Sequence, residues 1–365
     1  MTSPNPATQT SNGERLKTRT PGRDSTIDAM RGLAILAMVA AHMATMILAE
    51  PHPLWFRLYG SFAAPLFILM SGMMVALTAE SKKNPLHYFA VRGFMVVMVA
   101  AFIDLGIHHV YPFLSFDVLY LIGISIPLIF MFVALKGAVR WILIGIIFAA
   151  APFLQSMLGY SPMPTEVFIW ENPLTLASHL PHILRHWVVD GWFPLVPWLG
   201  FSFLGVQFAQ WRWKEGKHQL GSTASLGVGL VILLLGAVIF GLQMTTLMTR
   251  NGYSELFYPP TSGYILTAIG LIIVLFSVMK AVGRVVPLQF LHVLGEASLF
   301  MYIIHLAIIQ YVLVMFLSLE DLRMTSFMAI YGVLLAVLIL IGYAVRHVKR
   351  IWTSRPFIAR FLLGG

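Results

Sequence analysis

Charged residues are scarce in this 365-residue chain, and cysteine is absent. Only 11% of the residues are charged, whereas a soluble domain carries about 25%. The chain therefore cannot cover a water-facing surface, and a soluble globular enzyme is excluded. The absence of cysteine excludes disulfide scaffolds, cysteine-ligated metal sites and a thiol nucleophile. A hydrophobic share of 58% also excludes disorder for most of the chain.

Long apolar runs alternate with short polar breaks, which is the pattern of membrane-spanning helices. At about 20 residues per span, we predict an all-α fold: a polytopic integral membrane bundle of about ten transmembrane helices. The ninth run is long enough to tilt or to break. The ten runs are residues 27–48, 62–78, 89–107, 118–135, 141–158, 193–210, 226–242, 264–278, 290–317 and 328–345.

The basic residues lie mostly on one side of this arrangement. With ten alternating spans and a cytoplasmic N-terminus, nineteen of the 24 Lys and Arg residues fall on the cytoplasmic side. This distribution follows the positive-inside rule and predicts that both termini are cytoplasmic. The net charge of +9 thus reflects topology. The sequence has no dense basic stripe with interleaved aromatic residues, so it does not indicate nucleic-acid binding. The remaining basic residues are Arg31, within the first span, and Arg57, Arg185, Arg250 and Arg323 outside.

The chain divides into three parts. Residues 1–26 are polar and are expected to form a disordered cytoplasmic tail, residues 27–345 a single transmembrane bundle, and residues 346–365 a basic cytoplasmic tail. Within the bundle, residues 159–191 form a long extracytoplasmic loop. Its aromatic and aliphatic content argues for order, and loops of this length are often functional.

The first span carries the most informative ionisable residues. Asp28 and Arg31 are three residues apart on one helix face and can pair. Arg31 and His42 are eleven residues apart, which corresponds to about three turns and a rise of roughly 16 Å along the same face. Arg31 is therefore expected near the cytoplasmic edge and His42 near the bilayer midplane, where a histidine can act as a general base.

Five motifs, spread from about Ser25 to His305, give the chain a family resemblance. The first is DAMRGLA at residues 28–34 followed by His42, which resembles the first-helix pattern of transmembrane acyltransferases of the acyltransferase-3 type. Two further motifs are similar to the bacterial branch related to heparan-α-glucosaminide N-acetyltransferase. The other four motifs are FAAPLFILMSG (62–72), DVLYLIG (117–123), FPLVPWLG (193–200) and LGEASLFMYIIH (294–305), of which the middle two indicate that branch.

The resemblance implies an enzyme of the bacterial cytoplasmic membrane that transfers an acyl group, usually acetyl. The donor would be cytoplasmic acyl-CoA as a co-substrate, with no bound cofactor, and the acceptor a hydroxyl or amine of an extracytoplasmic glycan. His42 would be the catalytic histidine, either activating the acceptor or carrying the acyl group, with Arg31 and Asp28 supporting the site near the donor. A homodimer is left open.

Three further polar residues are candidates for the catalytic site or the lining of its cavity. His52 lies in the loop after the first span, where the branch related to heparan-α-glucosaminide N-acetyltransferase can carry its working histidine; the alternative is a solvated loop residue. Ser71 lies deep in the second span and serves either a ligand or helix packing. His305 in the ninth span either lines the same cavity or bonds to a neighbouring helix. Arg92 and Arg284 at cytoplasmic helix ends are candidate ligands of CoA phosphates or of anionic lipid.

The extracytoplasmic mouth is rich in histidine, carboxylate and tryptophan. We predict that it binds the acceptor through His108, His109, Asp117, Asp190, Trp192 and Trp198. His179, His182, His186 and Asp190 share one helix face with a spacing that could suit zinc. No HExxH-like motif accompanies them, so no metal site is predicted.

A transporter is the competing interpretation, with His42 and Arg31 as a relay for protons or substrate. Transporters commonly contain paired repeats with broken helices. The two halves of this chain show no convincing similarity, and the order of the motifs favours the enzyme. The sequence does not identify the acceptor.

Overall fold

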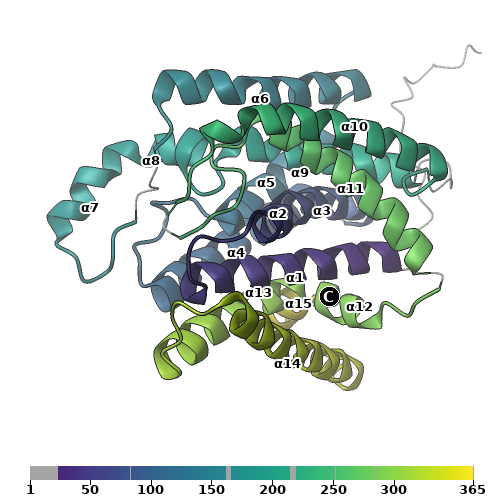
Figure 1. Cartoon of the computed structure of the whole chain (residues 1–365). Helices are drawn as coiled ribbons and strands as arrows, with labels where there is room; N and C mark the ends of the chain where they lie inside the picture. Colours follow the sequence, from purple (N-terminus) through teal and green to yellow (C-terminus); the bar gives the residue numbers. More distant parts are fainter. Residues whose placement is uncertain are drawn as a thin grey trace, which may run out of the picture.

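The computed structural model describes residues 24–82, 84–161, 166–213, 219–250, 252–283 and 285–364. Within these ranges the chain is built of helices (Figure 1), which confirms the all-α prediction. The α-helices are α1 (Ser25–Ile47), α2 (Leu54–Ser61), α3 (Ala63–Thr78), α4 (Pro85–Ile103), α5 (Val118–Val133), α6 (Gly137–Leu158), α7 (Pro173–His179), α8 (Ile183–Arg185), α9 (Leu195–Trp213), α10 (Thr223–Gln243), α11 (Ser262–Val282), α12 (Gln289–Glu296), α13 (Ser298–Ala307), α14 (Met324–Ile351) and α15 (Phe357–Leu363). Short π-helical segments continue three of them: η2 (Asp104–His108), η4 (His186–Asp190) and η7 (Ile308–Phe316).

The ten apolar runs predicted from the sequence all lie in helical segments, and the ninth is divided between α12, α13 and η7. In the described part of the chain, eight helices are long and apolar enough to cross a membrane. A ninth span results if the helical segment Leu174–Asp190 and α9, which are bent by 46° at the break between them, count as one span. Helix α5 is apolar but shorter. The chain is therefore a polytopic helical membrane protein, and the prediction of about ten spans differs from this finding because α5 and the bent pair fall outside the simple length rule.

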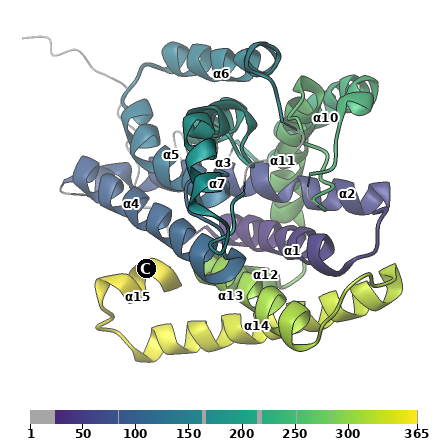
Figure 2. The same ribbon diagram turned by 90° about the vertical axis from the view of Figure 1, so that its left-hand side faces the viewer.

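Both predicted tails contribute to the helical structure. Residues 1–23 lie outside the described residues, but helix α1 begins at Ser25, capped by the Asp24 side chain on Thr26 N. Asp24 also accepts hydrogen bonds at 2.7 and 3.0 Å from Arg212 at the end of α9. At the other end, residues 346–351 are the last turns of α14 and residues 357–363 form α15, which lies between α4 and α14 (Figure 2).

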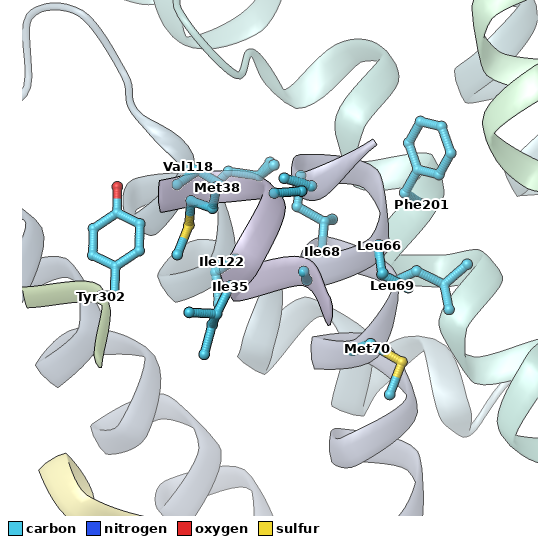
Figure 3. Close-up of a cluster of buried hydrophobic side chains, with 14 of the residues drawn as sticks. Ile35, Met38, Leu66, Ile68, Leu69, Met70, Val118, Ile122, Phe201 and Tyr302 are labelled. Carbon is cyan, nitrogen blue, oxygen red and sulfur yellow. The ribbon is translucent and has the colours of Figure 1, made fainter. Parts of the chain in front are cut away.

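Helix α1 lies in the middle of the bundle, with α14 on one side and α6 and α10 on the other (Figure 1). Most of its residues are apolar, and seven of its 23 residues are alanine or glycine, so that neighbouring helices pack closely around it. The core joins α1 to α3, α5, α9 and α13 (Figure 3). Its labelled members are Ile35, Met38, Leu66, Ile68, Leu69, Met70, Val118, Ile122, Phe201 and Tyr302.

The ninth predicted run is broken, as its length suggested. Helix α12 ends at Glu296 and α13 begins at Ser298, with Ala297 between them at φ −127° and ψ 41°. Helix α12 packs on α1 at van der Waals contact of the backbones, since a Cβ on Gly295 would lie 2.1 Å from the Asp28 carbonyl oxygen. The break therefore redirects the chain just after its closest approach to α1, and it fixes where α13 starts.

Helices α3 and α9 also cross with their backbones in contact. A Cβ on Gly72 would lie 1.9 Å from the Ser202 carbonyl oxygen, and a Cβ on Gly205 would lie 2.2 Å from that of Leu69. Because backbone atoms cannot yield as a flexible side chain can, both positions require glycine.

We expect Gly72→Ala to lower the free energy of unfolding by about 3 kcal/mol, because the new methyl group forces the helices apart. Thermal unfolding in detergent, followed by the monodisperse fraction on size exclusion, measures this. Gly227→Ala on α10 is the matched control, since its Cβ would meet nothing within 4 Å among the described residues. Equal melting temperatures for the two variants would contradict the close crossing.

Candidate functional site

Two histidines from distant parts of the chain meet in the interior of the bundle. His42 is on α1 and His305 on α13, and His42 Nδ1 lies 2.9 Å from His305 Nε2. Their rings are stacked at a centroid distance of 5.1 Å. The other ring nitrogen of His305, Nδ1, lies 2.8 Å from the carbonyl oxygen of Met301. His305 is completely buried, at 0% exposure.

These contacts determine where the protons lie when both rings are neutral. The Met301 carbonyl can only accept a hydrogen bond, so His305 carries its proton on Nδ1 and accepts at Nε2. His42 must then donate from Nδ1 to His305. The lone pair of His42 remains on Nε2, the nitrogen that a general base needs.

His42 lines a cavity of about 410 Å³. The walls come from the second half of α1, the junction of α2 and α3, η2, the start of α5, α13 with η7, and the loops around Trp192 and Glu255. These are the helix ends and loops that the predicted topology places on the extracytoplasmic side. The cavity therefore joins His42, which the sequence predicts near the midplane, to the predicted extracytoplasmic side of the bundle.

Four carboxyl groups line this cavity, and the described lining residues include neither Lys nor Arg. They belong to Asp104, Asp117, Glu166 and Glu255. Burial raises the pKa of the Asp117 and Glu166 carboxyls, although the hydrogen bonds that they accept oppose that shift. The cavity is thus suited to a ligand rich in hydrogen-bond donors and unsuited to an anion.

At the inner end of α1, Arg31 and Asp28 form the pair predicted from their spacing, with 4.0 Å between Nη1 and Oδ1. Arg31 also donates from Nη2 to the Ser298 hydroxyl at the start of α13. Arg31 therefore connects the two helices that carry His42 and His305. It does not line the cavity.

Two of the further candidates make their hydrogen bonds outside the set of residues that line the cavity. His52 is buried, and its ring nitrogens contact Ser254 Oγ at 2.7 Å and the Leu48 carbonyl at 3.3 Å. The interpretation of His52 as a solvated loop residue is therefore wrong. Ser71 donates to the Ile68 carbonyl of its own helix at 2.7 Å. Neither residue is among those that line the cavity.

The residues predicted to bind the acceptor divide into two groups of three. His108, Asp117 and Trp192 line the cavity. His109 instead lies against Trp170, and Trp198 is buried among aromatic side chains behind the wall. Asp190 is buried and pairs with His186 at 2.7 Å and Arg185 at 3.1 Å.

That arrangement also explains the histidine face considered for zinc. His186 and Asp190 bond to each other, and no group of three or more His, Asp or Glu residues suited to a metal ion occurs in the described ranges.

Of the two arginines predicted to bind CoA, only Arg92 lies within the described residues. The Arg92 guanidinium lies over the Phe361 ring of α15, with 5.7 Å between Cζ and the ring centroid. Arg284 lies outside the described residues. The C-terminal helix therefore packs beside one of the proposed phosphate ligands.

Sequence reasoning missed the residue that holds the outer loops together. Arg250 has 0% exposure and donates to the carbonyl oxygens of Ser161, Asp190 and Gly191 at 2.6–2.9 Å. Its guanidinium also lies 4.5 Å from the Tyr160 ring centroid. Sequence reasoning also passed over Tyr253, Glu166 and Glu255, since their only signal was their place in extracytoplasmic loops.

The His42–His305 contact predicts coupled stabilities. In a double-mutant cycle of His42→Ala and His305→Ala, we expect a coupling energy of about 1 kcal/mol, the usual net value of a buried hydrogen bond. Unfolding in detergent measures it. The exposed His87 supplies a control cycle with His42 for which the effects should add. Additivity in both cycles would contradict the contact.

A comparison with known protein families matches residues 23–240 to the family described as heparan-alpha-glucosaminide N-acetyltransferase, catalytic. No curated protein matches the chain. The family match includes His42 and most of the cavity wall, whereas Glu255 and His305 lie beyond it. Together with the apolar helices, the match supports a membrane acetyltransferase-type activity. The chain belongs to the family of heparan-α-glucosaminide N-acetyltransferase catalytic domains.

Proposed function

We propose that this chain transfers an acetyl group from cytoplasmic acetyl-CoA to a hydroxyl or amine of a glycan on the extracytoplasmic side. The observation that carries the proposal is the Nε2 of His42, which has no hydrogen-bond partner among the described residues, belongs to a residue that lines the cavity, and is held in its tautomer by His305. Family membership supplies the class of reaction.

In the proposed reaction, His42 Nε2 removes the proton from the acceptor O–H or N–H as the oxygen or nitrogen attacks the thioester carbonyl carbon. The new C–O or C–N bond forms and the C–S bond breaks. The CoA thiolate leaves and receives the proton from His42 Nε2. General base catalysis of this kind contributes typically about 10²- to 10⁴-fold.

His305 acts through His42 as a positioning residue. Its Nε2 accepts from His42 Nδ1 and so fixes the ring orientation and the proton position. Its own Nδ1 is fixed by the Met301 carbonyl. The two hydrogen bonds, from His42 to His305 and from His305 to the Met301 carbonyl, thus keep the lone pair of His42 Nε2 available before either substrate binds. A general base requires this form of preorganisation.

The walls of the cavity support a sugar acceptor. Aromatic rings of Trp192, Tyr253, Phe257 and Tyr258 line it beside the four carboxyls. Aromatic faces can carry the apolar faces of sugar rings while carboxylates accept their O–H and N–H groups. Of the six residues predicted from the sequence, we retain His108, Asp117 and Trp192 as acceptor ligands.

The donor is proposed to approach from the inner end of α1. Arg31 is about 16 Å along the helix from His42, so the thioester end of an extended pantetheine arm, rather than the nucleotide, has to reach His42. Arg92 is a proposed phosphate ligand for the nucleotide. The setting is the bacterial cytoplasmic membrane with both termini in the cytoplasm. One chain supplies all of these residues, so the reaction does not require the homodimer.

His42→Ala is expected to reduce acetyl transfer by about 10²- to 10⁴-fold through loss of the base, and His305→Ala by a smaller factor. The assay supplies labelled acetyl-CoA with glucosamine or glucose to the protein in detergent. His87→Ala, an exposed histidine on α4, should match the wild type.

The opposing results are distinct. A wild-type protein that neither binds CoA nor transfers the acetyl group would overturn the proposed function and favour the transporter. Full activity of His42→Ala, with loss of activity in a folded His52→Gln, would move the base to His52. An acetyl adduct on His42 in intact-mass measurements would replace general base catalysis with an acyl-histidine intermediate.

A further inference from the structure

The four carboxyl groups of the cavity are not equivalent. Three of them are engaged by donors of the protein itself: Asp104 by the Tyr120 hydroxyl, Asp117 by the Tyr302 hydroxyl at 3.0 Å, and Glu166 by Trp192 Nε1 at 2.7 Å. Glu255 Oε2 is buried and has no hydrogen-bond partner among the described residues. The Glu255 residue is only 7% exposed. A buried carboxylate oxygen without a donor is costly, which indicates that a ligand supplies the donor.

The segment that carries Glu255 is held firmly at this place. The next residue, Leu256, donates from its backbone N–H to Ser61 Oγ at 2.7 Å. The Tyr264 hydroxyl donates to the Ser61 carbonyl at 2.6 Å. The preceding residue, Ser254, accepts from Arg57 Nε at its carbonyl at 2.6 Å. Glu255 is therefore fixed on both sides, so the placement of this residue is a built feature of the cavity wall.

The wall opposite Glu255 is kept small. A Cβ on Gly60 would lie 3.5 Å from Glu255 Oε1 and 3.3 Å from the Ala41 Cβ. Gly60 and Ala41 both line the cavity with Glu255 and His42. The side chain of Tyr253, two residues before Glu255, makes an edge contact with the His42 ring at a centroid distance of 6.2 Å.

From this geometry we propose that Glu255 binds the acceptor, accepting a hydrogen bond at Oε2 from an O–H or N–H of the sugar. This inference rests on the proposed function and adds to it a residue that positions the acceptor relative to His42. The proton removed in the reaction goes to His42, so Glu255 contributes to acceptor affinity and orientation. Removal of the Glu255 carboxylate should raise the KM for the acceptor and leave the KM for the donor unchanged.

Glu255→Gln is the direct test, because it keeps the shape and removes the charge. With glucosamine as the probe, we expect the acceptor KM to rise about 10- to 100-fold, as expected for losing a hydrogen bond to a charged group. The KM for acetyl-CoA should stay unchanged. Glu255→Asp, which keeps the carboxylate on a shorter side chain, should fall between Gln and wild type. Glu320→Gln, at an exposed position, is the control.

The pH dependence provides a readout that a purely structural role would not move. Burial raises the pKa of Glu255 to about 7, opposed by its own backbone N–H and by Arg57. The other titratable groups that face it are Tyr253, Tyr258 and Tyr264. As the pH falls through 7 the carboxylate is protonated, so the acceptor KM should rise in the wild type. With glucose as the acceptor, which does not titrate in this range, this change should be absent in Glu255→Gln.

The contrary outcomes separate this proposal from the proposed function. If the wild type transfers acetyl and Glu255→Gln retains the wild-type acceptor KM and pH profile, the role of Glu255 is refuted and the proposed function stands. If the wild type does not transfer acetyl, the proposed function fails first. Should Glu255→Gln not fold, Glu255→Asp is the second variant, and a wild-type acceptor KM in that variant refutes the proposal.

Discussion

A single hydrogen bond between two imidazole rings links α1, near the beginning of this chain, to α13, in its last quarter. His42 and His305 are separated by 263 residues, and their contact requires α1 and α13 to lie side by side with a fixed offset. The offset depends on the break at Ala297, and the separation depends on the glycine contact between α12 and α1. Arg31 adds a second connection through Ser298. In an apolar bundle, such polar links specify how helices pair, because each unpaired group would be costly.

The outer part of the molecule is organised by a different principle. Arg250 is buried, and its two Nη nitrogens donate to backbone carbonyls of two separate segments. A guanidinium can make several such bonds in a fixed plane, so one side chain substitutes for the regular structure that these loops lack. The result is a rigid wall made of irregular segments, in which Trp192 and the loop of Glu255 keep their places. A preformed cavity needs this rigidity, since ligands are bound best by groups that do not have to be ordered first.

Much of the helical architecture follows from the sequence. Apolar runs of sufficient length have few alternatives to helices in a membrane, and the Asp28–Arg31 pair follows from spacing within one helix. The pairing of His42 with His305 does not follow, because helix spacing says nothing about residues on different helices. His52 illustrates the opposite error: a loop position suggested solvent, but Ser254 from a distant loop covers it. The sequence does not single out Glu255, because a loop carboxylate is usually solvated. The burial of Glu255 depends on contacts that Ser61 makes with α11 and with the loop before α11.

The chain of hydrogen bonds from His42 through His305 ends on the neutral peptide carbonyl of Met301 rather than on a carboxylate. A carboxylate at that place would stabilise an imidazolium and allow the enzyme to hold a proton between the two halves of a reaction. A carbonyl offers only a partial charge, so protonated His42 would be a short-lived species in the proposed reaction. Proton uptake from the acceptor and proton delivery to the departing thiolate must then follow each other closely. In the proposed reaction, transfer is then most efficient when donor and acceptor are bound together, and hydrolysis of acetyl-CoA without an acceptor is disfavoured.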